Sequence, residues 1–401
     1  MERKYTRLRL LMTVILYAGV LPLGQVYGQT AVPLRDISDV LHSIFAKKKV
    51  GNSKTDTIAP VLRPAFSGLP AVGYTLTTKF AVTLTGNVAF RLDTGARIST
   101  VTSSVSYTER KQFTFPFESN IWTRNNNYDF VGDMRFMNYH LSTFGLGSNS
   151  SMDDKDPMKY NYVRFYEVVL RKITPAFFAG AGYILDWHYN ISDQGIAGHV
   201  TDYAQYGAES STLSTGFTLN TLYDTRDNSI SAQKGIYASA TYRNNLNSLG
   251  STRSWQSMIL DVRKYVHFPV DTRNTWAFWS YDWLVVGGKP PYLSLPSTGW
   301  DTYTNTGRGY IQGRFRGKEM VYLESEYRFP LTTDGLFGAV VFLNGETFSG
   351  YPGNRLESVQ PGMGGGLRIK LNSASRTNLD IDYGFGTQGS KGLFVNIGEA
   401  F

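Results

Sequence analysis

From about residue 70 onwards, apolar and polar side chains alternate with a period of two along segments of about ten residues. In 377–385, which reads TNLDIDYGF, apolar residues hold every second position from Leu379 to Phe385, and Asn378, Asp380 and Asp382 stand between them. Period-two alternation is typical of β-strands with one apolar and one polar face. The sequence therefore predicts an all-β fold, and the same alternation recurs in 216–224, 276–285, 321–329 and 366–372.

Two all-β architectures fit this pattern, a soluble sandwich or barrel and an outer-membrane β-barrel. One face of the strands mixes aliphatic residues with Tyr, Phe and Trp, as in a lipid-facing band with aromatic girdles. The other face carries charge, and a soluble core would rarely bury Glu324, Glu326 and Arg328 side by side. At roughly 20 residues per strand and connection, the span holds about 16 strands. We therefore expect 70–401 to form a transmembrane antiparallel β-barrel.

The polar connections between these segments differ in length. Short ones such as 332–335 suit periplasmic turns, whereas 141–158, 189–210 and 287–316 suit extracellular loops.

The beginning of the chain has the features of a cleaved export signal, which we place at 1–28. Basic residues precede an apolar run from Leu10 to Leu23 that is too short to span a bilayer comfortably. We expect 29–69 to be a short periplasmic segment before the barrel. An amphipathic stretch from Ile37 to Phe45 leaves three readings open: a tail, a helix on the inner leaflet, or a plug in the barrel.

Composition excludes several kinds of chemistry. The chain has no cysteine and only five dispersed histidines, so no metal site is indicated. It contains no GxSxG, HExxH or glycine-rich phosphate motif. The net charge of +8 is too scattered to indicate nucleic acid as a partner. We expect a protein that is not an enzyme and has no cofactor.

Four segments stand out by their order along the chain. Positions 223–228 read YDTRDN and are followed by Lys234 and Gly235, and 307–310 read GRGY inside the long 287–316 stretch. Positions 324–330 read ESEYRFP, and 394–401 read FVNIGEAF. Taken together, these segments resemble the motifs of the BamA/TamA family of outer-membrane proteins, also called the bacterial surface antigen family.

The resemblance implies that the long loop folds back into the lumen of a 16-strand barrel. Arg308, beside Gly309 and Tyr310, would then pair with Glu326 on the inner wall. The family's second partner lies in an FxDxG strand, where this chain has Asn344 in place of the aspartate and Glu346 in place of the glycine. Asn344 could still accept a hydrogen bond and Glu346 could supply the missing charge. The plainer alternative is a solvated Arg308.

The other two motifs also carry expectations. Asp224, Arg226 and Asp227, with Gly235, either brace a strand end by local hydrogen bonds or take part in gating or partner docking. The last segment would be the signal by which assembly machinery recognises a barrel, and the residues concerned are Phe394, Ile397, Gly398 and Phe401.

By its resemblance, the chain would take part in outer-membrane protein insertion, assembly or translocation, through a weak seam between strands near 72–92 and 390–401. Segment 29–69 is too short for the periplasmic POTRA domain that such proteins carry, which weakens the transfer of this function. The alternative is a passive pore or a structural barrel of a surface complex, with 287–316 as constriction. Expected partners are outer-membrane lipid and lipopolysaccharide, and client outer-membrane proteins or a surface complex.

Overall fold

The computed structural model describes residues 34–37, 39–40, 64–75, 79–302 and 304–401. The expected signal peptide, 1–28, lies outside the described residues, as does most of the amphipathic stretch that follows it.

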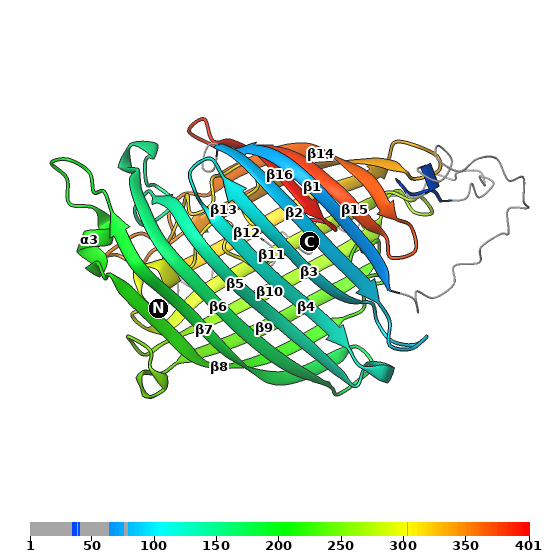
Figure 1. Cartoon of the computed structure of the whole chain (residues 1–401), viewed down its shortest axis with the longest axis horizontal. Helices are drawn as coiled ribbons and strands as arrows, with labels where there is room; N and C mark the ends of the chain where they lie inside the picture. The colour runs from blue at the N-terminus through cyan, green and yellow to red at the C-terminus, as the bar shows by residue number, and fades with distance from the viewer. Residues whose placement is uncertain (1–33, 38, 41–63, 76–78, 303) are drawn as a thin grey trace, which may run out of the picture.

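The described chain forms one sheet of sixteen strands, each paired antiparallel with the next in sequence (Figure 1). This confirms the all-β class and the strand number expected from the alternation. The first strand begins five residues before the expected boundary. The strands are β1 Ala65–Thr75, β2 Lys79–Phe90, β3 Ser99–Thr108, β4 Phe113–Trp122, β5 Tyr128–Thr143, β6 Asp156–Lys172, β7 Phe177–Asp193, β8 Ser211–Asp224, β9 Gly235–Asn245, β10 Trp255–His267, β11 Thr275–Gly288, β12 Glu319–Pro330, β13 Phe337–Phe348, β14 Gln360–Asn372, β15 Thr377–Phe385 and β16 Lys391–Ile397.

The sheet curls so that its two edge strands approach each other. β1 and β16 lie side by side in Figure 1, and their Cα traces come within contact distance. Within the described part of the chain, however, no hydrogen-bonded ladder joins them. The barrel therefore has a seam between its first and last strands.

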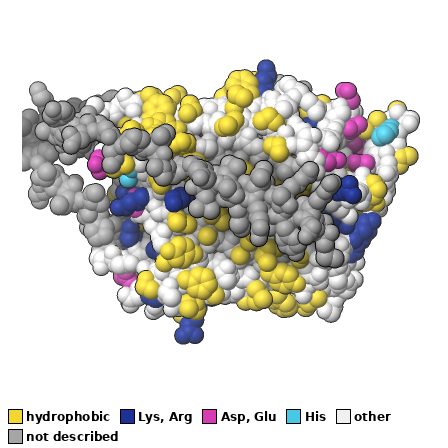
Figure 2. All heavy atoms as spheres, turned by 180° about the vertical axis from the view of Figure 1, so that it is seen from behind, with side chains coloured by type: hydrophobic (Ala, Val, Ile, Leu, Met, Phe, Trp, Pro, Cys, Tyr) yellow, Lys and Arg dark blue, Asp and Glu magenta, His cyan; other side chains and the backbone are white. Residues whose placement is uncertain are grey.

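The alternation along each strand separates an outer wall from a lumen. On β8, Leu219 is 64% exposed and the next residue, Asn220, is 7% exposed. On β13, Leu343 is 57% exposed and Asn344 is 4% exposed. The apolar residues therefore face outwards and the polar residues face inwards, the reverse of a soluble core. Figure 2 shows hydrophobic side chains along the outer wall and charged ones gathered towards its two ends.

One strand departs from this pattern. On β11, the alternating aromatics Trp279, Tyr281 and Trp283 are buried in the lumen, and outward-facing Asp282 stands between them. The inward position of Trp279 has a local cause, because its indole N–H donates to Asp261 on β10 at 2.9 Å. The expectation that aromatic stripes face lipid therefore fails for this strand.

The connections differ at the two ends of the barrel. One end, called here the short-turn end, carries the turns at 91–98, 123–127, 173–176, 225–234, 268–274, 331–336 and 373–376. The opposite long-loop end carries 144–155, 194–210 and 289–318, with the helix α3 Asp202–Gly207 in the second of these. None of the helices among the described residues is long and apolar enough to cross a membrane.

A short piece of the N-terminal segment lies on the short-turn end. The Arg35 N–H donates to the Asp334 carbonyl at 3.1 Å, and the Asp36 carboxylate accepts the Ser373 N–H at 2.9 Å. Asp36 and Asp39 each accept the other's backbone N–H, so they form a capping box at the start of a short helix. The contacts with Asp334 and Ser373 attach this piece to the β12–β13 and β14–β15 turns.

Candidate functional site

The connection between β11 and β12, residues 289–318, folds into the barrel and is called here the lumen loop. Several of its side chains are fully buried, among them Arg308, Arg314 and Phe315. The loop also binds the β5 wall, where Tyr139 donates its hydroxyl to Gln312 and Arg135 donates to the Thr302 carbonyl. A loop with this much buried surface and this many wall contacts is part of the packed interior.

Arg308 is the deepest anchor of the lumen loop. Its guanidinium pairs with Glu324 and Glu326 on β12 and with Asp382 on β15. The guanidinium also lies over the Phe342 ring, with 3.9 Å from Cζ to the ring centroid. Arg308 is 1% exposed and its three carboxylate partners are also buried. In this structure Arg308 is therefore not a solvated loop arginine.

The two β13 residues expected to assist Arg308 behave differently from each other. The expectation that Asn344 accepts a hydrogen bond is corrected, because its side-chain N–H donates to the Arg308 carbonyl at 2.9 Å and so binds the loop's backbone instead of the guanidinium. Glu346 accepts the Thr298 hydroxyl at 3.1 Å instead of the guanidinium. The expectation that Glu346 supplies the missing charge is corrected here, because Glu324 and Asp382, together with Glu326, supply the carboxylates that pair with Arg308.

Gly309 and Tyr310 fix the backbone beside Arg308. Gly309 has φ +111°, and a Cβ there would lie 2.7 Å from the Phe385 carbonyl oxygen, so only glycine permits this approach to β15. The Tyr310 hydroxyl donates to the Pro361 carbonyl at 2.5 Å and accepts the Thr387 N–H at 3.1 Å. The GRGY segment thus supplies one ionic contact, one close backbone approach and one aromatic anchor.

The Arg308 site extends into a larger lumen ion network. Arg328 on β12 lies 2.5 Å from Glu326, and Arg368 on β14 lies 2.5 Å from Asp382 and 2.8 Å from Glu399. The network therefore links the lumen loop, three strands and the end of the sequence. Its members are Arg308, Arg328, Arg368, Glu324, Glu326, Asp380, Asp382 and Glu399.

Such a network holds position more than it adds stability. Desolvating each ion costs several kcal/mol, and mutual attraction repays this only with close, hydrogen-bonded geometry. Removing one partner then leaves an unpaired buried charge, at a cost of about 3–5 kcal/mol. The arrangement is therefore sensitive to any change in the loop's position.

At the outer part of the loop, Arg314 forms a second anchor. Its guanidinium donates to the Ser150 carbonyl at 2.6 Å and to the Gln388 side chain at 3.1 Å, and it lies over the Phe315 ring. Burial lowers the pKa of Arg314 to about 10, because desolvation disfavours its charge. This anchor ties the lumen loop to two connections at the long-loop end.

The last segment of the sequence turns into the lumen. On β16, Phe394 pairs with lumenal Asp382, whereas Ile397 pairs with outward-facing Leu379. Gly398, at φ +124°, then redirects the chain inwards. The buried Phe401 ring stacks on Trp279 with 5.1 Å between centroids, and its carbonyl accepts Arg328 at 2.9 Å.

The 223–235 motif braces the strand end and also reaches beyond it. Asp224 accepts both the backbone N–H and the guanidinium of Arg226 at 3.0 Å, as local bracing requires. Asp224 also binds Arg97, from the turn after β2, at 2.8 Å. Asp227 accepts the N–H of Gln233 at 2.9 Å, next to Gly235 at the start of β9.

Asp227 also makes a long-range contact, because it pairs with Arg376 of the β14–β15 turn at 2.6 Å. Burial alone would raise the pKa of Asp227. Hydrogen bonds from Arg376 and from the backbone of Gln233 and Lys234 outweigh burial and hold this pKa below its usual value.

Sequence reasoning did not assign Glu324, Asp382 or Glu399 to the network, although the sequence carries a signal for the first two. Glu324 and Asp382 stand on the polar faces of strands whose alternation was evident, so both were recognisable as lumenal carboxylates. Glu399 lies within the terminal motif, but nothing in the alternation indicated that the chain turns inwards after Ile397.

Comparisons with known proteins give a likeness of fold. No family model matches the sequence, and no curated protein matches it either. Among solved structures, BamA from Haemophilus ducreyi lacking POTRA domains 1–3 is 12% identical, with a TM-score of 0.51 over 84% of this chain and 69% of that one.

Two CdiB structures are similar to the same degree. CdiB from Acinetobacter baumannii is 13% identical, with a TM-score of 0.52 over 83% of this chain. CdiB from Escherichia coli is 11% identical, with a TM-score of 0.53 over 83% of this chain. The chain spans only 59% and 61% of these two proteins, so the likeness concerns the barrel fold.

Proposed function

We propose that this chain is an outer-membrane β-barrel of the BamA/TamA type that takes part in inserting, assembling or translocating other outer-membrane proteins. The observation that carries the proposal is the buried GRGY anchor, in which Arg308 binds β12 and β15 close to the seam. The fold likeness to BamA and CdiB supports it. An apolar outer wall around a charged lumen supports an outer-membrane location.

The seam offers a physical route for this activity. Unpaired backbone groups in lipid each cost several kcal/mol, so an edge without a ladder is a favourable place for another strand to pair. β16 has 7 residues and β1 has 11. Because Gly398 turns the chain into the lumen, the edge of β1 extends beyond its neighbour. A client strand that pairs with β1 would satisfy those exposed groups.

Insertion can be tested with purified components. The chain is reconstituted in liposomes, and a urea-unfolded eight-strand barrel from the same host is added as client. We expect the client to fold several-fold faster than with empty liposomes, and Arg308→Ala to remove this acceleration. Equal rates with and without the protein would contradict insertion activity.

The passive-pore alternative predicts a different measurement. The lumen loop occupies the barrel interior through Arg308, Tyr310 and Phe315, so the native protein should conduct poorly in planar bilayers. A protein lacking 300–314 tests whether the loop is the constriction. Large, stable channels in the native protein, without client folding, would favour the pore over assembly.

A further inference from the structure

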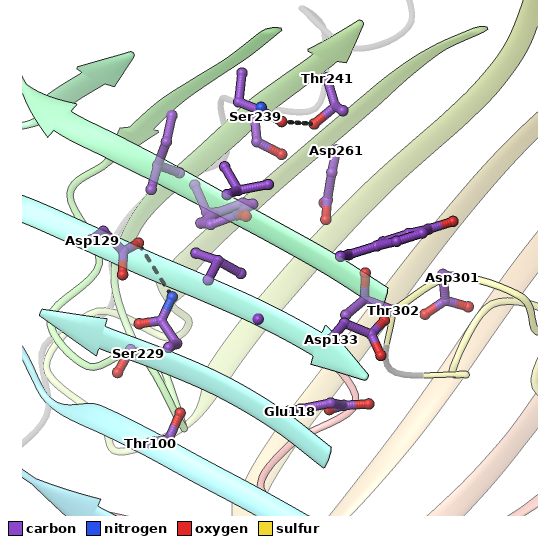
Figure 3. Close-up of a pocket in the computed structure, with 18 of the residues that line it drawn as sticks. Thr100, Glu118, Asp129, Asp133, Ser229, Ser239, Thr241, Asp261, Asp301 and Thr302 are labelled. Carbon is purple, nitrogen blue, oxygen red and sulfur yellow. Dashed lines mark hydrogen bonds between the residues drawn. The ribbon is translucent and has the colours of Figure 1, made fainter. Parts of the chain in front are cut away.

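The lumen is not filled completely, because a chamber of about 370 Å³ remains between the lumen loop and the short-turn end (Figure 3). Trp300, Asp301 and Thr302 of the lumen loop line one side of it. Ser229 and Ile230, from the β8–β9 connection, line it towards the short-turn end. A chamber of this size is within the range that holds small ligands.

Residues 225–234, called here the floor segment, lie between the chamber and the short-turn end. Two side chains attach the floor segment to the β14–β15 turn. Asn228 donates to the Ser375 carbonyl at 3.2 Å, and Asp227 pairs with Arg376 at 2.6 Å. Ser229 reaches the Ile98 carbonyl at 3.5 Å on another side. These polar contacts lie outside the strand ladders, and the buried Ala232 adds an apolar contact of the floor segment with the core.

The described residues that line the chamber carry seven carboxylates and four guanidinium groups. Figure 3 labels five of the carboxylates, Glu118, Asp129, Asp133, Asp261 and Asp301. The four guanidiniums are already bound to carboxylates, in the pairs Arg164–Asp133, Arg226–Asp224, Arg243–Asp186 and Arg263–Asp261. Arg135 and Arg368, from outside the lining, bind two more of the lining carboxylates, Glu118 and Glu399.

Two of the seven lining carboxylates form no ion pair among the described residues. One is Asp301, which accepts the N–H groups of Asn305 and Thr306 in its own loop, and the other is Asp129 on β5. Asp129 is 0% exposed, and the Asn120 side chain donates to its Oδ2 at 3.2 Å. Among the described residues, Oδ1 has no hydrogen-bond partner. Arg97 and Arg226 attract the Asp129 carboxylate electrostatically, but both guanidiniums are bound to Asp224 instead. A buried carboxylate in this state is costly unless a cation or a proton joins it.

We propose that the chamber is a binding site for a small organic cation, which enters past the floor segment and is received by Asp129. Asp129 is the second residue of β5 and lies near the short-turn end, so an entering cation meets it early. The site is independent of client insertion, and its test does not use insertion activity.

The test exploits the absence of cysteine from the chain. Thr100 lines the chamber and pairs across strands with Asn120, the amide that holds Asp129. Thr100→Cys is folded in detergent and treated with a cationic reagent, trimethylammonioethyl methanethiosulfonate, or an anionic one, sulfonatoethyl methanethiosulfonate. The labelling rate of the cysteine with each reagent is divided by the rate at which the same reagent reacts with a free thiol in solution. We expect a preference of about tenfold or more for the cation, because the Asp129 carboxylate attracts it inside a cavity with low-dielectric walls.

Asp129→Asn should reduce this preference several-fold, whereas Asp153→Asn, a matched change at the long-loop end, should leave it unchanged. Tetramethylammonium chloride should slow the cationic reagent in the parent and not in Asp129→Asn. Equal normalised rates, or an unchanged preference in Asp129→Asn, would overturn the cation site and leave Asp129 as a carboxyl group that holds only a proton.

A separate experiment tests whether the cation enters past the floor segment. Asn228→Ala combined with Arg376→Ala should raise the labelling rate several-fold, and Arg355→Ala at the long-loop end should not. Unchanged labelling in the double variant would overturn this entry route. If Thr100→Cys does not fold, Ser239→Cys on the opposite wall serves as the reporter, because Ser239 also lines the chamber. No labelling of either cysteine would overturn the proposal as a whole.

Discussion

Arg308 and Asp382 are 74 residues apart in sequence and form an ion pair inside the barrel. The pair joins the lumen loop to β15, the strand that is hydrogen-bonded to β16 at the seam. Any movement of β15 is therefore coupled to the position of the loop. The relationship gives the GRGY segment a mechanical role that substitution can test.

Removing the guanidinium should release the lumen loop. In Arg308→Ala, Glu324, Glu326 and Asp382 lose their shared cation, and the loss of a buried partner costs about 3–5 kcal/mol. We expect limited proteolysis of the folded protein to cut within 289–318 at least several-fold faster. Arg355→Ala, which removes an exposed arginine, is the control. An unchanged cleavage rate would show that the loop is held without Arg308.

Asp382 and Glu346 should differ sharply when each is made neutral. Asp382 binds both Arg308 and Arg368, whereas Glu346 accepts the Thr298 hydroxyl. We expect Asp382→Asn to lower the urea midpoint of unfolding clearly and Glu346→Gln to change stability by no more than about 1 kcal/mol. The reverse order would mean that Glu346 supports the loop's charge after all.

A methyl group at position 309 should displace the loop while every charge is kept. In Gly309→Ala the new Cβ would lie 2.7 Å from the Phe385 carbonyl oxygen, at a φ of +111° that side chains disfavour. We expect the proteolysis pattern of Arg308→Ala to appear in this variant. Gly353→Ala, where a Cβ meets nothing within 4 Å, is the matched control. Normal protection in Gly309→Ala would argue against a close backbone fit.

The inward position of Phe401 also predicts a measurable loss. Phe401→Ala removes the ring stacked on Trp279 and leaves a cavity beside the network, at a typical cost of about 3–5 kcal/mol. We expect a lower urea midpoint and a red-shifted tryptophan emission. Phe217→Ala removes an outward-facing ring that is 53% exposed and should change both values less. Equal effects would indicate that Phe401 does not pack in the lumen.

Most of the fold could be predicted from the alternation of apolar and polar side chains. It distinguishes inward from outward positions because a strand has only two faces, so Glu324, Glu326 and Asp382 were recognisable as lumenal. Pairing across the lumen could not be read in this way. Whether Asp382 or Glu346 meets Arg308 depends on how far the loop descends, which the barrel sets as a whole. The inward turn at Gly398 could not be predicted either, because it depends on contacts that Phe401 makes in the lumen with Trp279 and Arg328.

The most direct test of the central claim is to deplete the protein in its own host and quantify the outer-membrane proteome. We expect a broad fall in other barrel proteins, restored by the parent gene and not by the Arg308→Ala variant, at equal levels of the protein itself. An unchanged set of barrel proteins after full depletion would contradict a part in their insertion or assembly.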